Sequence, residues 1–221
     1  MRLPLGCGPI DEILGGGVEP GCITLLFGEA GSGKTNICLQ LARNAVRSGK
    51  KVIYIDTEGV SMERLAQICG DDFELVAKNI LFSEPYNLEE QEKLIDKAIK
   101  ITEGSSEVGL IVVDSVTMHY RLTLRDEVRE DRYALSRQIA KLMRVSRKVG
   151  IPIAVTSQVY TDLDSGDYLP LGGHVLLHSA KTIMRLDKLG PSTRAAILMK
   201  HRAREEGRRA KFRLTENGVE A

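Results

Sequence analysis

The chain has 221 residues, of which 43% are hydrophobic, a fraction that is ordinary for a globular protein with one substantial core. Its 31 Lys and Arg residues balance 30 Asp and Glu residues, which leaves a net charge of +1. This balance excludes a whole-protein field that would attract nucleic acid or an anionic membrane, so any anion site must be local. No apolar run approaches about 18 residues, and we expect no membrane span.

Four cysteines, Cys7, Cys22, Cys38 and Cys69, are spread over the first third of the chain. None belongs to a CxxC pair, and none has a histidine nearby at metal-ligand spacing. This spacing argues against a zinc site and against a disulfide framework. We therefore expect reduced thiols and an intracellular protein.

Apolar runs of strand length alternate with amphipathic segments through the first two thirds of the chain. This alternation is typical of a mostly parallel sheet covered by helices, so the sequence predicts an α/β fold. The expected strands are 22–27, 51–56, 79–83, 109–114 and 151–156. The expected helices are 33–48, 88–102 and 132–149.

The first expected strand runs directly into a glycine-rich octapeptide that opens the first expected helix. Its residues are Gly28, Glu29, Ala30, Gly31, Ser32, Gly33, Lys34 and Thr35. The pattern GxxxxGK[ST] at a strand-to-helix junction is typical of a P-loop, whose backbone N–H groups surround phosphates. Lys34 is expected to reach the β- and γ-phosphates of ATP, and Thr35 to hold Mg²⁺ through its hydroxyl.

Two acids follow the next expected strands. Asp114 ends the apolar run 110–114, where a carboxylate next to a P-loop strand commonly supports Mg²⁺; the alternative is a helix-capping Asp. Glu58 follows the strand 51–56 and is placed to orient a hydrolytic water. For Glu58, a capping or surface role is an equally good reading of the sequence.

The pattern of apolar and polar residues changes after Ser157. The segment 159–170 reads as a loop with three aspartates, and the runs 182–186, 195–199 and 211–214 read as strands connected by hairpins. We therefore expect an antiparallel C-terminal extension of the same sheet. Residues 1–221 show no linker long enough to separate two domains, which predicts a single domain.

Two segments carry local positive charge that could bind DNA. In 121–132, arginines recur at helical spacing, although acids between them also fit a solvated helix with internal ion pairs. In 200–213, seven Lys and Arg residues outnumber two Glu, and a hairpin turning at Gly207 would present them to phosphates; the alternative is a solvated hairpin. The DNA-binding candidates are Arg121, Arg125, Lys200, His201, Arg202, Arg208 and Arg209.

Several motifs together carry a family resemblance. They are the segment 6–17 (GCGPIDEILGGG), the P-loop, 54–59 (YIDTEG), 110–115 (LIVVDS) and 172–174 (GGH). In this order and over nearly the whole chain, they resemble the core of the RecA/RadA recombinases. The resemblance implies a RecA-like ATP-binding domain that uses ATP and Mg²⁺.

The resemblance also implies roles for individual residues. Glu58 matches the water-activating acid, and Gln158 matches a glutamine that senses the γ-phosphate, so both join Lys34 as catalytic candidates. Arg64 matches an arginine that stacks on adenine, and it joins Asn36 and the P-loop as nucleotide-binding residues. Thr35 and Asp114 match the metal site.

The departures from the recombinases narrow the expected function. No N-terminal helical domain is expected within residues 1–221, and the segment 159–170 is short and acidic where recombinases carry a long DNA-gripping loop. In this the chain is similar to the core-only archaeal RadB paralogues. We expect an accessory protein of homologous recombination and DNA repair that binds ATP and DNA and hydrolyses ATP weakly.

The expected partners are DNA, single-stranded by preference and bound without sequence specificity, the main recombinase with other recombination proteins, and a further copy of the chain. No membrane partner is expected, and the expected location is the prokaryotic cytoplasm near the nucleoid. Two alternatives stay open: a self-sufficient DNA-dependent ATPase recombinase, and a RecA-like ATP-switched regulator that binds proteins. The acidic segment 159–170 favours the regulator, and the basic segment 200–213 favours DNA binding.

Overall fold

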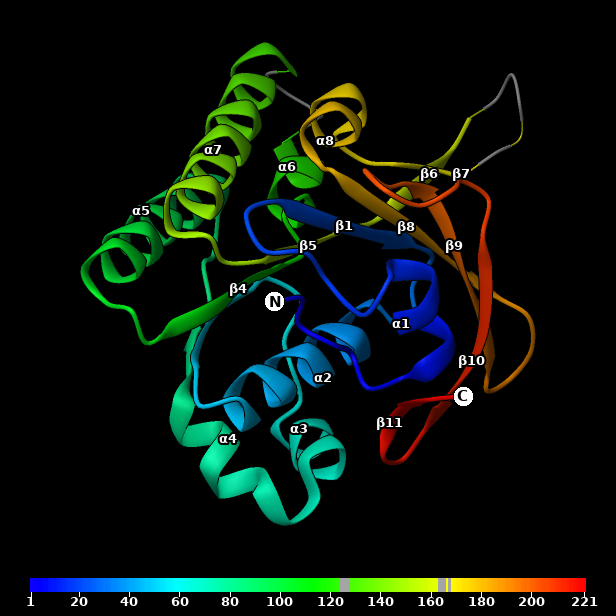
Figure 1. The fold of residues 1–221 in the computed structure, drawn as a ribbon. Coiled ribbons are helices and arrows are strands. Elements are labelled where there is room, and N and C mark those ends of the chain that lie inside the picture. The colour runs from blue at the N-terminus through cyan, green and yellow to red at the C-terminus, as the bar shows by residue number, and fades with distance from the viewer. Residues whose placement is uncertain (124–127, 163–165, 167) are drawn as a thin grey trace.

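A computed structural model describes residues 1–123, 128–162, 166 and 168–221, without the side chains of 121–130. Within these residues nine strands form one sheet in the order β11-β10-β9-β8-β1-β5-β4-β2-β3 (Figure 1). The strands are β1 Ile23–Gly28, β2 Lys51–Asp56, β3 Ile80–Ser83, β4 Val108–Asp114, β5 Ile153–Ser157, β8 Thr182–Lys188, β9 Thr193–Lys200, β10 Arg209–Thr215 and β11 Gly218–Glu220.

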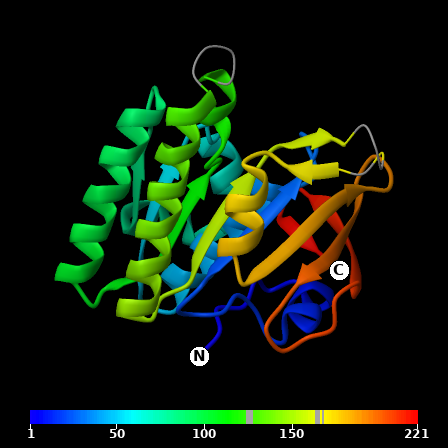
Figure 2. The same ribbon diagram turned by 90° about the horizontal axis from the view of Figure 1, so that it is seen from above.

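Helices cover both faces of this sheet, as the two views in Figures 1 and 2 show. One face packs against the first four: α1 Gly8–Leu14, α2 Lys34–Arg47, α3 Met62–Cys69 and α4 Phe73–Asn79. The other packs against α5 Leu88–Gly104, α6 Met118–Thr123, α7 Val128–Val149 and α8 Gly173–Ser179. The strands β1 and β4 in the middle of the sheet are buried along almost their whole length and are mostly apolar, because helices cover the sheet on both sides.

Strand direction confirms the predicted fold. Neighbours among β3, β2, β4, β5, β1 and β8, taken in their order across the sheet, pair in parallel. The strands β8, β9, β10 and β11 then pair antiparallel, each with the next. The register places Asp56 opposite Asp114 and Phe27 opposite Ser157. The carboxyl ends of the central strands therefore meet at one edge of the sheet, which is where ligands bind in open α/β folds.

The prediction of a plain loop at 159–170 is wrong. Two short strands, β6 Val159–Thr161 and β7 Tyr168–Pro170, pair antiparallel as a small second sheet beside the main one. Val159, Tyr160, Thr161 and Tyr168 are β-branched or aromatic residues, which favour extended backbone. The prediction of a loop gave more weight to the three aspartates of this segment than to its β-branched and aromatic residues.

The first residues of the chain and its last strand are both fastened to α2 by one buried side chain. Gln40 donates from Nε2 to the carbonyl oxygens of Leu5 and Val219, each at 3.0 Å, and its Oε1 accepts from Val219 N–H at 2.8 Å. Asp11 adds to this by accepting from the N–H groups of Leu5 and Gly6. The helix that begins in the P-loop is thereby held against both ends of the fold.

Candidate functional site

The P-loop is built at the junction of β1 and α2. All six residues of β1 are buried, and the chain turns after Gly28 into the first turn of α2 at Lys34. Gly33 has φ +102°, and a Cβ on Gly28 would come within 2.3 Å of the Leu186 carbonyl oxygen. Both positions require glycine because of this backbone conformation and this close approach.

Lys34 places its ammonium inside the loop. Nζ donates to the carbonyl oxygens of Gly28 at 2.9 Å and Glu29 at 3.1 Å, and the residue is 6% exposed. Burial lowers the pKa of the ammonium, while the charges of Glu58 and Asp114 raise it. The ammonium is thus a buried cation held by carbonyl dipoles, and it is ready to exchange one of them for a phosphate oxygen.

A buried hydrogen-bond network fixes Asp114 at the end of β4. The carboxylate is 0% exposed, and it accepts hydrogen bonds from the Tyr54 hydroxyl at 2.9 Å and from the Thr156 hydroxyl. The Thr35 hydroxyl lies beside the same carboxylate and favours its charged form. Burial raises the pKa of Asp114, and these three hydroxyl donors oppose the rise. The structure therefore joins Thr35 and Asp114, the two residues predicted for the metal site.

The donor set at this point fits Mg²⁺. A single carboxylate and a hydroxyl supply hard oxygen atoms, and Mg²⁺ commonly binds one or two carboxylates together with substrate phosphates and water. No cluster of three or more His, Cys, Asp or Glu side chains that would hold a metal by itself occurs among the described residues. The hydroxyl of Ser32 in the P-loop is 0% exposed, and the described part of the chain offers it no hydrogen-bond partner. These observations fit a metal-nucleotide better than a resident metal ion.

Asp56 shapes the turn that carries Glu58. Its carboxylate accepts hydrogen bonds from the N–H groups of Glu58 at 3.1 Å and Gly59 at 3.0 Å, and also from that of Val60. Glu58 then accepts a hydrogen bond from Gln158 Nε2, with 3.0 Å between Oε1 and the nitrogen. The two polar side chains predicted as water-orienting acid and phosphate sensor are therefore direct neighbours, although 100 residues separate them in sequence.

Arg64 lies beside Asn36, and both were predicted to bind nucleotide. Arg64 Nε donates to Asn36 Oδ1 at 2.6 Å. Its other nitrogens donate to the carbonyl oxygens of Thr215, the last residue of β10, and of Glu216 in the turn before β11. The guanidinium therefore connects α2, α3 and the last hairpin, and its planar face is the part left for stacking on a base.

Arg194, which supports the P-loop from β9, was not predicted from the sequence. Arg194 is 7% exposed, and its Nε donates to the Gly31 carbonyl oxygen at 3.0 Å. Its Nη1 donates to carbonyl oxygens of the β8–β9 turn, including that of Gly190 at 2.7 Å. Lys188 comes near the same loop, with Nζ 3.5 Å from the position that a Cβ on Gly31 would occupy. Lys188 and Arg194 lie in β8 and β9, which the sequence predicted as hairpin strands without any role at the P-loop.

The predicted hairpin over 200–213 is confirmed as β9 and β10, with Gly207 at φ +84°. Its DNA-binding candidates differ in their surroundings. Lys200 Nζ donates to the Leu177 carbonyl oxygen at 2.8 Å, and burial lowers the pKa of this ammonium. The His201 side chain is only 1% exposed, whereas Arg202 and Arg209 are exposed and Arg208 is half-buried.

Two other DNA-binding candidates belong to the segment 121–132. Arg125 and the side chain of Arg121 lie outside the described residues. Their assignment stays a prediction.

The family model described as Rad51 matches residues 1–221. The chain belongs to the Rad51 family. It is 47% identical over 220 residues to the "DNA repair and recombination protein RadB" of Methanococcoides burtonii, with 99% of this chain and 97% of that protein covered. The protein of the same description from Archaeoglobus fulgidus is 40% identical over 222 residues, with 100% and 98% covered.

Within the Rad51 family the chain groups with RadB proteins in structure as well. A solved structure described as "Crystal structure of the RadB recombinase" superposes with a TM-score of 0.85 at 36% identity, and 99% of each chain is covered. The predicted resemblance and the predicted RecA-like fold are thereby confirmed. Among the described residues we find no helix that could span a membrane.

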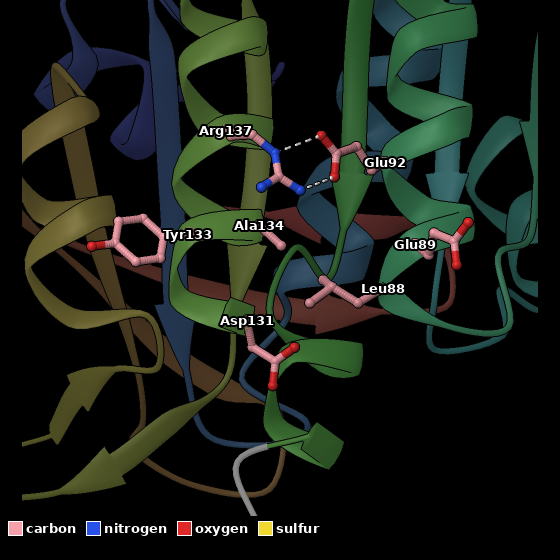
Figure 3. A pocket seen from close by; sticks show the side chains of 7 residues that line it. All are labelled: Leu88, Glu89, Glu92, Asp131, Tyr133, Ala134 and Arg137. Carbon is pink, nitrogen blue, oxygen red and sulfur yellow. Dashed lines mark hydrogen bonds and ion pairs between the residues drawn. The ribbon is translucent and has the colours of Figure 1, made fainter. Parts of the chain in front are cut away.

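A further groove of about 760 Å³ lies between α5 and α7 (Figure 3). Across it Arg137 donates two hydrogen bonds to the Glu92 carboxylate, at 3.2 and 2.9 Å, and Lys141 forms a second ion pair with the same acid. None of its lining residues belongs to the P-loop or to the strand ends beside it. These charges fasten the two helices to one another.

Proposed function

We propose that this chain is an ATP- and DNA-binding accessory protein of homologous recombination and DNA repair, with weak ATP hydrolysis. One observation carries the proposal: Lys34, Thr35, Asp114, Glu58 and Gln158 converge on the carboxyl edge of the central strands. The names of the relatives, all "DNA repair and recombination protein RadB" in the comparisons given above, support the cellular process.

Each residue has a role that its contacts allow. The P-loop N–H groups and Lys34 would bind the phosphates, and Arg64 and Asn36, which are hydrogen-bonded to each other, would hold the base. Thr35 and Asp114 would hold Mg²⁺, which would neutralise charge that develops on the phosphates. Glu58, on the turn that Asp56 holds, orients a water, and Gln158 couples this acid to the β6–β7 hairpin that follows it.

The contacts of Arg194 support the proposal of weak hydrolysis. Rapid phosphoryl transfer is commonly assisted by an arginine that stabilises the charge on the γ-phosphate in the transition state. Among the described residues, Arg194 is the arginine bonded to the P-loop, and its guanidinium is directed at the Gly31 carbonyl oxygen and the β8–β9 turn. An arginine held by four carbonyl oxygens is not free to move onto a phosphate.

The test is fluorescence anisotropy of labelled single-stranded DNA with the pure protein, with and without ATP and Mg²⁺, over a salt series. Phosphate release is measured in the same tubes. The proposal expects salt-dependent DNA binding with little phosphate release. Rapid DNA-stimulated phosphate release would instead make the chain a recombinase in its own right.

A second outcome contradicts the DNA-binding part of the proposal. If no DNA is retained at low salt while ATP still binds, the chain acts as an ATP-switched regulator of protein partners. A glutamate pair, Arg208→Glu with Arg209→Glu, provides the site-specific comparison, because both residues follow the turn at Gly207 in the basic hairpin.

A further inference from the structure

The outward face of β10 carries a row of three cations. Burial alternates along this strand: Ala210 and Phe212 are buried, whereas Arg209, Lys211 and Arg213 are exposed. The inward residues pack in the same apolar cluster as α1, and α1 contacts both β9 and β10. In Figure 1, β10 lies at the margin of the molecule, and no helix is drawn over its outer side.

The charged groups of these three residues make no stabilising contact with the described part of the chain. In the part of the chain that the structure describes, no ion pair and no side-chain hydrogen bond is formed by Arg209, Lys211 or Arg213. By contrast, Arg185 on the neighbouring part of the sheet is paired with Asp187 at 3.1 Å. Free cations on a rigid strand lose little when a partner anion arrives, because no existing pair has to break.

The residues around the row set its chemical character. Across β9 the register partners of the three cations are Ile197, Ala195 and Thr193, none of which is charged. On the other side, Glu220 of β11 lies opposite Arg213 without forming an ion pair. The face is therefore positive along one line and neutral on the side of β9.

We infer that this β10 row, defined as Arg209, Lys211 and Arg213, is a track that binds the phosphates of a nucleic acid strand. Alternate residues of a strand stand about 6.7 Å apart on one face, so the three cations form an evenly spaced line of charge. Evenly spaced point charges on a fixed backbone match a repeating phosphate backbone better than they match an acidic protein surface. The inference rests on the DNA binding proposed above and assigns it to a surface.

The track contacts phosphates and reads no bases. Arg and Lys are donors without acceptor capacity, and the neutral neighbours on β9 are two aliphatic residues and one threonine. Binding through this row is therefore independent of sequence and falls steeply with salt. The adjoining loop adds the exposed Arg202 and Arg204 and the half-buried Arg208 against the exposed Glu205 and Glu206, which leaves the loop with a net positive charge.

The experiment compares two triple variants of the full chain. The first is Arg209→Gln, Lys211→Gln and Arg213→Gln; the control is Lys78→Gln, Lys97→Gln and Lys100→Gln, which removes the same charge from exposed lysines of α4 and α5. Affinity for a labelled single-stranded oligonucleotide is measured between low and physiological salt. Loss of three phosphate contacts predicts that the slope of log K against log salt falls by about 2 and that affinity at 0.15 M drops about 50-fold.

The control variant is expected to match wild-type protein in both slope and affinity. Thermal unfolding and binding of a fluorescent ADP analogue show whether each variant is folded, and a double variant, Arg209→Gln with Lys211→Gln, replaces the triple if the triple is unstable. Equal losses in the two triple variants, or no loss in the first, overturn the inference while DNA binding stands. If wild-type protein itself binds no oligonucleotide, the proposed DNA binding fails before the surface is tested.

Discussion

The carboxyl edge of the central sheet and the outer face of β10 both concentrate charged groups, but the structure treats them in opposite ways. At the sheet edge, Lys34, Asp114 and Glu58 each have defined hydrogen-bond partners. On β10, Lys211 and its two neighbours in the row have none among the described side chains. A prearranged network is sensitive to the position of each atom, whereas a free row is sensitive to the sum of its charges.

Removing the charge of Asp114 is expected to have the largest effect. Asp114→Asn keeps the size of the side chain but removes the anion that Thr35 and Mg²⁺ would share. The expected loss is about 2 to 3 kcal/mol, or roughly 30- to 150-fold in affinity for ADP with Mg²⁺. Titration with a fluorescent ADP analogue measures it. The same titration in EDTA is the control, and an equal loss there would remove Asp114 from the metal site.

Loosening the P-loop from β9 is expected to have a smaller effect. Arg194→Met keeps an unbranched side chain but removes the hydrogen bond to the Gly31 carbonyl oxygen. We expect nucleotide affinity to fall by about 1.5 kcal/mol, roughly 10-fold, because a charge-assisted bond that fixes the loop is lost. Arg194→Lys provides the comparison, since it keeps the charge without the planar fork. Full affinity in the Met variant would show that the loop is fixed without this residue.

Removing one oxygen atom from Tyr54 tests how sensitive the network is to a single bond. Tyr54→Phe leaves the buried ring but removes the donor to Asp114 at 2.9 Å. The expected loss is about 1 kcal/mol, or roughly fivefold in the Mg²⁺ concentration needed for half-maximal nucleotide binding. The measurement is a Mg²⁺ titration at fixed fluorescent ADP, with binding in EDTA as the reference. A change confined to thermal stability would limit Tyr54 to packing.

The smallest effect is expected for a single cation of the β10 row. Lys211→Gln removes one of three similar contacts, so DNA affinity at 0.15 M salt should fall about fourfold and the salt slope by about 0.7. Nucleotide affinity should stay at the wild-type value, because Lys211 is exposed on the face of β10 opposite the buried Phe212, whose ring lies near Gly33 of the P-loop. The anisotropy series used for the triple variant measures both quantities. A loss as large as that of the triple would mean that Lys211 binds one specific group.

The sequence predicted the parts of this fold that follow from long periodic signals. The central strands and the helices α2, α5 and α7 were expected because their apolar residues recur over many positions, and the P-loop carries its own motif. The helices α1, α3 and α4 were not predicted. They are seven or eight residues long, so too few turns exist for a helical period to stand out.

The site residues also divide into those with a signal in the sequence and those without one. Residues that act through a local motif or a family resemblance, such as Thr35 and Glu58, could be named in advance. Tyr54 and Arg194 could not, because each acts across strands on a group far away in sequence, and a tyrosine or an arginine in a strand has no pattern that shows its partner. The placement of His201 is of this kind too: its type suggested a surface ligand, whereas tertiary packing leaves its side chain 1% exposed.

The side chain of Gln40 has a consequence for how the two ends of the fold depend on one another. Its amide bonds to Leu5 on one side and to Val219 on the other, which are 214 positions apart, so a change that frees either segment leaves the same amide half-satisfied. Destabilising substitutions in the two segments are then expected to be non-additive, since the second removes a bond that the first has already weakened. The strand that closes the sheet and the residues that precede α1 form one cooperative unit, and the helix of the P-loop is its centre.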